Sequence, residues 1–239
     1  RRSSDLARPQ VMGILNVTPD SFSDGGRFHH VDAALEQAAA LRAQGAAIID
    51  VGGESTRPGA APVSEAEEID RVRPVIEALS AEGALVSIDT RKPAVMEAAA
   101  AAGAGIINDV TGLTGDPRSF DTAVALGLPL CLMHMQGEPD TMQTAPTYSD
   151  VVQDIADFLN QRLAEVSGVG IDLDRVMIDP GFGFGKTAEQ NFELLARLSE
   201  LQDLRQPVLV GLSRKSMISS VLDRPPEQRA YASVSLALM

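Results

Sequence analysis

Seven apolar runs separated by helical patterns restrict the fold of this chain more than any other feature. The runs cover residues 11–17, 47–52, 85–90, 105–110, 129–135, 176–179 and 207–212. They are apolar almost throughout rather than alternating with polar residues, which is typical of parallel strands covered by helices. We therefore expect an α/β protein with a parallel sheet.

Helical patterns occupy most of the segments between these runs. Gly45 and Gly103 follow two of them, where a left-handed residue ends many helices, and Ser64 opens a third with a capping-box pattern. Residues 136–148 lack periodicity and are expected to form a long loop over the mouth of the fold. The predicted helices span residues 32–44, 64–81, 93–102, 149–166, 187–201 and 213–222.

Strand–helix units repeated in this way predict a (β/α)8 TIM barrel. An open, doubly wound sheet is the alternative that alternation leaves possible. Polar motifs follow at least five of the runs, whereas an open sheet concentrates its site at one switch point, so the motifs favour the barrel. No linker or repeat divides the chain, and we expect one domain spanning residues 1–239.

The eighth strand of this barrel has no candidate in the sequence. Residues 230–239 are expected to form a helix that leads back towards the barrel, and the sequence stops there. Seven strands would leave a seam of unpaired backbone groups. We therefore expect a C-terminally incomplete domain whose natural chain continues to an eighth strand, and low stability and activity without it. A partner chain covering the seam is the alternative.

Composition excludes several classes of function. The formal net charge of −13 argues against a nucleic-acid partner, which requires a basic surface. No apolar run approaches the roughly 18 residues that span a bilayer, so no membrane partner is expected. The single cysteine, Cys131, excludes an internal disulfide and fits a reducing cytoplasm. Without a Cys/His cluster, a structural zinc site is not expected.

Three polar, glycine-rich motifs directly follow apolar runs. They read NVTPDSFSDGG at 16–26, GGESTRPG at 52–59 and DPGFGFGK at 179–186. In a barrel of parallel strands, active sites are built where the strands end at their carboxyl side. We therefore expect the functional site at that end.

These motifs, in this order, resemble those of the dihydropteroate synthase family. The resemblance continues through SIDT at 87–90, INDV at 107–110, MHM at 133–135 and GLSRK at 211–215. It implies a cytoplasmic, homodimeric transferase of folate biosynthesis that uses Mg²⁺. The implied reaction joins 6-hydroxymethyl-7,8-dihydropterin diphosphate to p-aminobenzoate, releases diphosphate and is a target of sulfonamides. The family's C-terminal Arg-x-His pair has no match in this chain.

The resemblance implies a pterin pocket built from strand ends. A carboxylate such as Asp179 can accept two parallel hydrogen bonds from an amino-pyrimidinone edge, and Lys215 can donate to a ring oxygen or nitrogen. A strand-end aspartate can instead cap the next helix, although Thr90 is a plausible cap beside Asp89. Asp89, Asp179 and Lys215 are the candidate catalytic residues. The expected pterin-binding residues are Asp89, Asn108, Met133, Asp179, Phe184 and Lys215.

The diphosphate site is expected on the first two loops. Asn16 would bind Mg²⁺ through its side-chain oxygen, with diphosphate oxygens and water completing an octahedron. Thr56 would donate to a phosphate oxygen, Arg57 would supply positive charge, and Asp50 would orient this region. Ordinary turn chemistry is the alternative for residues 16–20.

The p-aminobenzoate site is expected beside the diphosphate. Phe22 and Pro58 could enclose the aromatic ring, and Ser213 would bind the carboxylate at the N-terminus of the predicted helix 213–222. The Arg214 side chain could face either the site or solvent, and both alternatives stay open. His134 is expected to pack or support a loop, since the neutral arylamine needs no strong base.

Gly185-Lys186-Thr187 has the appearance of a P-loop, but the spacing is wrong. Gly181 fits the template only if the loop is one residue shorter. We therefore expect no nucleoside triphosphate site. A pterin-dependent methyltransferase on the same barrel and a non-catalytic pterin-binding protein remain alternatives, and the motifs at 16–26 and 55–59 favour the synthase.

Overall fold

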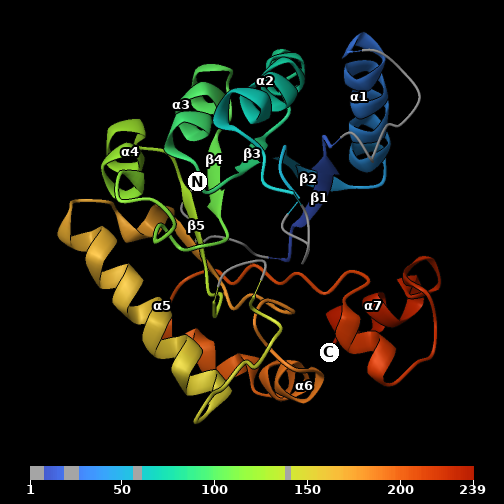
Figure 1. The fold of residues 1–239 in the computed structure, drawn as a ribbon, viewed down its shortest axis with the longest axis vertical. Coiled ribbons are helices and arrows are strands. Elements are labelled where there is room, and N and C mark those ends of the chain that lie inside the picture. Colours follow the sequence, from blue (N-terminus) through green and yellow to red (C-terminus); the bar gives the residue numbers. More distant parts are fainter. Residues whose placement is uncertain (1–7, 19–26, 56–60, 138–140) are drawn as a thin grey trace.

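Six strands form one parallel sheet in the computed structural model (Figure 1), which describes residues 8–18, 27–55, 61–137 and 141–239. Each strand pairs with the one before it in the sequence, in the order β1 to β6. A doubly wound sheet reverses its strand order at a switch point, so this order excludes that alternative and confirms the α/β barrel arrangement. The strands are β1 Val11–Asn16, β2 Ala46–Gly52, β3 Val86–Asp89, β4 Ile106–Asp109, β5 Leu130–Met133 and β6 Val176–Asp179.

A helix follows each strand and lies outside the sheet (Figure 1). The short helix α4 was not predicted, because eight residues give little more than two turns of periodicity. None of the described helices is long and apolar enough to cross a membrane. The helices are α1 Arg27–Ala43, α2 Glu65–Ala81, α3 Pro93–Ala101, α4 Ser119–Leu126, α5 Val151–Gly168, α6 Ala188–Ala196 and α7 Ala230–Ala237.

Local signals in the sequence define several helix ends. Gly45 and Gly103 adopt φ angles of 104° and 105° after α1 and α3, as predicted. The Ser64 hydroxyl accepts a hydrogen bond from the Glu67 amide at 3.2 Å. The Glu67 carboxylate pairs with Arg71 on the next turn, so only half of the predicted capping box forms.

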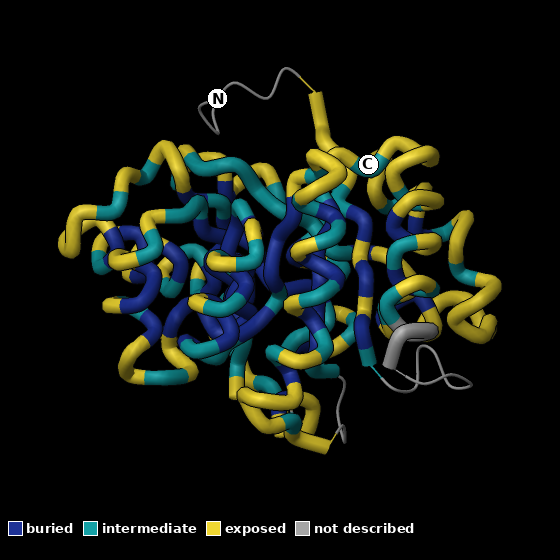
Figure 2. Tube along the Cα trace, turned by 90° about the horizontal axis from the view of Figure 1, so that it is seen from above, coloured by how far each residue is buried: buried dark blue, intermediate teal, exposed yellow. Residues whose placement is uncertain are grey.

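The core lies between the sheet and its helices. Figure 2 shows buried chain through the middle of the molecule and exposed chain around it. Strand residues such as Ile49, Ile88 and Leu132 are at most 1% exposed. Truncating one of these residues to alanine typically costs about 2–5 kcal/mol, because the cavity left behind only partly collapses. This packing fixes the strand ends that carry the polar residues.

The predicted strand 207–212 is reduced to a single parallel bridge between Ile178 and Val208. The Ile178 amide donates to the Pro207 carbonyl at 3.0 Å, and the Leu209 amide donates to the Ile178 carbonyl at 2.8 Å. The ladder stops there because β6 ends at Asp179 and the chain turns away. The described residues contain no eighth strand, and the incomplete domain remains a prediction.

The predicted helix 213–222 is wrong. Arg214 adopts a left-handed conformation, with φ of 55°, which an α-helix of L-residues does not accommodate. The chain forms only a five-residue 3-10 helix at Ser216–Ser220. Ser213 therefore does not lie at the N-terminus of an α-helix, and this rationale for its binding a carboxylate is lost.

Candidate active site

Polar side chains from four strands meet at the carboxyl end of the sheet. Asp50 lies in β2, Asp89 ends β3, Asn108 precedes the last residue of β4, and Asp179 ends β6. Asp89 pairs in register with both Gly52 and Asn108, which places it at the centre of this group. Asp50, Asn108 and Asp179 are each at most 8% exposed. The structure therefore brings the three predicted polar pterin residues of these strands together.

Burial raises the pKa values of the carboxyl groups in this pocket. The pKa of Asp179 rises to about 6, chiefly through burial. The pKa of Asp89 lies well above its ordinary value, first through burial and then through the neighbouring charges of Asp50 and Asp109. Carboxylates that share a buried space resist joint ionisation. The pocket therefore favours a ligand that brings N–H donors or positive charge.

Neither Asp89 nor Asp179 caps a helix. Helix α3 begins after Lys92 without a side-chain cap, and Thr187 caps α6 in a full capping box with Gln190. Asp179 does make one local bond, since its Oδ1 accepts from the Gly181 amide at 2.7 Å. The capping explanation fails for Asp89, and for Asp179 it is replaced by a turn that occupies one carboxylate oxygen.

Asp50 contacts the predicted pterin residue Asn108, and most of the loop residues that it was predicted to orient lie outside the described residues. The Asn108 amide nitrogen Nδ2 donates to Asp50 Oδ2 at 3.1 Å. This bond fixes the orientation of the amide, which leaves its oxygen free to accept from a ligand. Burial raises the pKa of Asp50.

Lys215 supplies the positive charge of the pocket. Asp179 and Asp89 each favour its charged form, while burial lowers its pKa. Its Nζ lies 4.5 Å from the centre of the Phe184 ring, a distance at which a cation is attracted to an aromatic face. Two predicted pterin residues thus contact each other, on segments that follow β6 and the Val208 bridge.

Side-chain oxygens of Asp89 and Asn16 both lie near Gly52 at the end of β2. A Cβ atom placed on Gly52 would lie 3.5 Å from Asp89 Oδ2 and 3.6 Å from Asn16 Oδ1. An amide oxygen suits Mg²⁺, so the chemistry of the Asn16 side chain fits the predicted metal ligand, which stays a prediction. Phe22, Thr56, Arg57 and Pro58, which were predicted for the diphosphate and p-aminobenzoate sites, lie outside the described residues.

Four other predicted positions differ in their exposure. Met133 ends β5, pairs in register with Asp179 and is 3% exposed, so it lines the floor near the carboxylates. Ser213 and Arg214 are exposed. His134 is buried with its ring edge against Phe158, 5.0 Å between centroids, which confirms the packing role.

Sequence reasoning missed an ion-pair group beside the site. Lys92 Nζ donates to Glu68 Oε2 at 2.6 Å, to Glu54 Oε1 at 3.0 Å and to the Val63 carbonyl at 2.6 Å. Glu68 also accepts from the Thr90 hydroxyl at 2.7 Å. The group joins the ends of β2 and β3 to the start of α2. The sequence signal was limited to Glu54 and Lys92 after two strand ends and Glu68 in the next helix. Charged residues in such positions also occur on ordinary protein surfaces.

Lys186 was also left without a role by the sequence. Its Nζ donates to the Gly181 carbonyl at 2.8 Å and to the Phe184 carbonyl at 3.0 Å. The side chain therefore points into the protein instead of towards a phosphate, which agrees with the exclusion of a P-loop.

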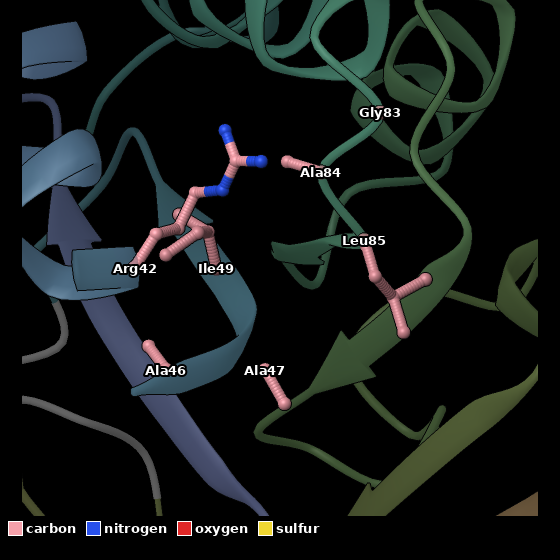
Figure 3. Close-up of a pocket in the computed structure, with 7 residues that line it drawn as sticks. All are labelled: Arg42, Ala46, Ala47, Ile49, Gly83, Ala84 and Leu85. Carbon is pink, nitrogen blue, oxygen red and sulfur yellow. The ribbon is translucent and has the colours of Figure 1, made fainter. Parts of the chain in front are cut away.

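A hollow at the other end of the sheet is separate from this group. It has a volume of about 240 Å³ and lies where β2 and β3 begin (Figure 3). Arg42 lines it, and the guanidinium is bonded to Glu82 at 3.1 Å. Active sites of β/α barrels lie at the carboxyl ends of strands, so this hollow is not the functional site.

The strand order defines the class, a β/α-barrel protein, and the carboxyl groups with raised pKa values beside Lys215 suit a ligand that brings N–H donors. The chain belongs to the pterin binding enzyme family, whose sequence profile matches residues 12–239. The dihydropteroate synthase of Haemophilus influenzae is 50% identical over 236 residues, covering 98% of this chain and 86% of the relative.

Solved structures agree with this assignment. A Yersinia pestis dihydropteroate synthase in complex with a sulfonamide drug has a TM-score of 0.92 and 52% identity, covering 98% of this chain and 85% of that one. A Xanthomonas albilineans dihydropteroate synthase in complex with 7,8-dihydropteroate has a TM-score of 0.87 and 48% identity, covering 98% and 84%.

Proposed function

We propose that this protein is a dihydropteroate synthase of folate biosynthesis, which condenses 6-hydroxymethyl-7,8-dihydropterin diphosphate with p-aminobenzoate. The grouping of Asp89, Asn108, Asp179 and Lys215 at the carboxyl end of the sheet carries this proposal. Identity of 50% to a named synthase over nearly the whole chain supports it.

The pocket matches the hydrogen-bonding groups of a pterin. Asp179 keeps one oxygen on the Gly181 amide and presents the other to the amino-pyrimidinone edge. The amide oxygen of Asn108, oriented by Asp50, accepts from a further ring N–H, and Lys215 donates to a ring acceptor. Phe184 covers the ring beside Lys215. A heterocycle lacking these N–H groups would leave buried carboxylates unpaired, which is costly.

The diphosphate would bind at the ends of β1 and β2. Asn16 would hold Mg²⁺ there, and when bound the ion would stabilise negative charge on the departing diphosphate. Thr56 and Arg57 are proposed to donate to phosphate oxygens. A divalent cation and these cationic and polar groups would also offset the net charge of −13, which otherwise repels an anionic substrate.

The reaction forms a carbon–nitrogen bond. The amine nitrogen of p-aminobenzoate bonds to the methylene carbon, the carbon–oxygen bond to diphosphate breaks, and the nitrogen loses a proton. The electron-rich pterin can carry positive charge as diphosphate departs. Asp89 and Asp179 then lie where that charge develops, and fixed anions in a buried site stabilise it strongly. These carboxylates therefore serve both binding and catalysis in this proposal.

The arylamine is proposed to bind second, between Phe22 and Pro58, with Ser213 contributing from its exposed position. Sulfonamides would bind at the same place. Binding of p-aminobenzoate should then require the pterin diphosphate or diphosphate with Mg²⁺. Equal affinity for p-aminobenzoate with and without diphosphate would contradict this order.

Two further properties are proposed from the family resemblance: a cytoplasmic location and a homodimer. The single buried thiol of Cys131 suits a reducing compartment. Light scattering of the purified protein tests the dimer, and a mass of one chain would refute it.

Product formation tests the proposed function directly. The purified protein is incubated with the pterin diphosphate, p-aminobenzoate and Mg²⁺, and diphosphate and dihydropteroate are quantified. Equal release of both products is expected. Pterin binding without turnover would indicate a non-catalytic binding protein, and transfer of a methyl group without diphosphate release would indicate a methyltransferase.

A further inference from the structure

We propose that Lys186 is a positioning residue of the pterin pocket, whose ammonium group holds the loop 181–186 so that Phe184 lies against Lys215. This inference rests on the proposed function only for the identity of the ligand. The contacts that carry it are bonds within the protein, from Lys186 to two backbone carbonyls and to His134.

All three donors of the Lys186 ammonium are used inside the protein. They meet the carbonyls of Gly181 and Phe184, at 2.8 and 3.0 Å, and Nδ1 of His134 at 3.1 Å. The residue is 3% exposed. Loss of the donor to a buried carbonyl costs about 1–3 kcal/mol when no other donor replaces it. Without Lys186 the Gly181 carbonyl would keep only the Phe184 amide, and the Phe184 carbonyl would lose its bond to the ammonium, so the loop conformation depends on this side chain.

The two carbonyls lie on either side of the turn that carries the aromatic ring. The Phe184 amide also donates to the Gly181 carbonyl at 3.1 Å, so Lys186 and Phe184 share an acceptor. Lys186 thereby closes the turn against the end of β5, where His134 is attached to β6 through its amide and the Asp179 carbonyl at 2.9 Å.

The loop is built to approach β5 closely. A Cβ on Gly181 would lie 2.0 Å from the His134 carbonyl, and one on Gly185 would lie 2.4 Å from the Gln136 carbonyl. A Cβ on Gly183 would lie 3.3 Å from Cδ of Lys215. The turn therefore packs between the end of β5 and the Lys215 side chain. The position of the turn determines where Phe184 contacts Lys215.

Protonation of Lys186 determines how many acceptors it can satisfy. Burial lowers its pKa to about 7, with Asp179 raising it and Lys215 lowering it further. His134 faces it in the neutral form, since burial first and Lys186 second lower the His134 pKa to about 3. A neutral amine has two donors for three acceptors, so the hold on the turn should weaken as the pH rises above 7.

Three variants separate positioning from general support. Lys186→Met keeps most of the length of the side chain and removes its donors. Tyr148→Phe is the matched control, because the Tyr148 hydroxyl also donates to this loop, at the Gly185 carbonyl, 2.7 Å. Phe184→Leu removes the ring that Lys186 is proposed to place. The readouts are the hydrogen-exchange protection of the Phe184 amide, affinity for the pterin diphosphate with Mg²⁺ by calorimetry, and thermal unfolding.

We expect Lys186→Met to weaken pterin binding about tenfold, as expected when a positioning contact is lost, and to remove the protection of the Phe184 amide. Tyr148→Phe should retain both. Adding Lys186→Met to Phe184→Leu should cost no further affinity. In the wild-type protein, Phe184 protection, corrected for chemical exchange, should fall between pH 6 and 9.

The proposal is overturned if Lys186→Met binds the pterin diphosphate as tightly as the wild-type protein and keeps the protection of the Phe184 amide. It is also overturned if the affinity losses of Lys186→Met and Phe184→Leu add up in the double variant. If Lys186→Met does not fold, protection that stays constant across the pH series of the wild-type protein overturns it instead. Failure of the wild-type protein to bind the pterin diphosphate would refute the proposed function alone, because the protection measurements need no ligand.

Discussion

Replacement of Asp179 by asparagine should remove the principal anchor of the pterin. In the structure, Oδ1 of Asp179 accepts from the Gly181 amide at 2.7 Å. In Asp179→Asn the amide oxygen must keep this position, because the Gly181 nitrogen is a donor. The new NH₂ group then faces the pocket, where it meets the N–H edge of the pterin, and two donors repel.

The size of this effect follows from the bonds that are lost. A hydrogen bond to a charged group contributes about 1.5–3 kcal/mol, so affinity should fall roughly 10- to 150-fold. The pKa of Asp179 is about 6, and the carboxylate is roughly nine-tenths ionised at pH 7. Wild-type affinity should therefore fall as the pH drops below 6. Asp179→Asn should lose the part of this fall that Asp179 causes, while Asp89, whose pKa burial also raises, keeps the rest.

Calorimetry with the pterin diphosphate between pH 5 and 8 measures both effects. Asp109→Asn is the matched control, because Asp109 is a buried strand-end carboxyl group with a pKa of about 6. Its Oδ1 accepts from the amide and hydroxyl of Thr111, each at 2.7 Å. This carboxyl group therefore binds another part of the protein and is not proposed to bind the pterin. Asp109→Asn should keep the fall in pterin affinity that the wild-type protein shows at acid pH. Unchanged affinity in Asp179→Asn, or a fall in affinity below pH 6 as steep as that of the wild-type protein, would refute the assignment.

Further predictions concern stability. His134 has a pKa of about 3 in the fold against 6.5 ordinarily, so its contribution to stability should fall by roughly 3–5 kcal/mol as the pH drops from 6.5 to 3. The raised pKa values of Asp109 and Asp179 act in the opposite direction. The stability of His134→Asn relative to the wild-type protein should therefore rise as the pH drops, and a constant difference in denaturation would contradict this. Gly181→Ala should not yield folded protein, because φ is 69° and the Cβ would clash. Gly168→Ala, with open space around it, should stabilise by about 0.5–1 kcal/mol in thermal melts. Lys92→Met should cost about 3–5 kcal/mol in urea denaturation, because the buried Glu68 loses its partner; a loss under about 1 kcal/mol would show that solvent reaches the pair.

Much of the fold was predictable because its signals are local. Continuous apolar runs located six strands to within one or two residues, and glycines marked the ends of α1 and α3. The predictions failed where the signal was short or depended on distant contacts. Helix α4 is too short to show a period, and the segment after Leu212 is shaped by the left-handed Arg214, whose amide donates to the Ser233 hydroxyl at 2.8 Å.

The strand-end positions of Asp89, Asn108 and Asp179 were determined by the sequence alone. A residue at the end of an apolar run emerges at the mouth of a parallel sheet whatever the details of packing. Their convergence follows from the strand order, which the motifs indicated. Recognition of the family added Lys215 and Phe184, residues whose local pattern carries no such geometric argument.

Only the tertiary structure decided what surrounds these residues. It oriented Asn108 through Asp50, turned Lys186 inward to His134, and raised the pKa of Asp179 to about 6. Each of these outcomes depends on atoms from segments far apart in the chain that exclude water from one another. Periodicity and propensity describe neighbours along the chain, whereas desolvation and hydrogen-bond direction are properties of neighbours in space.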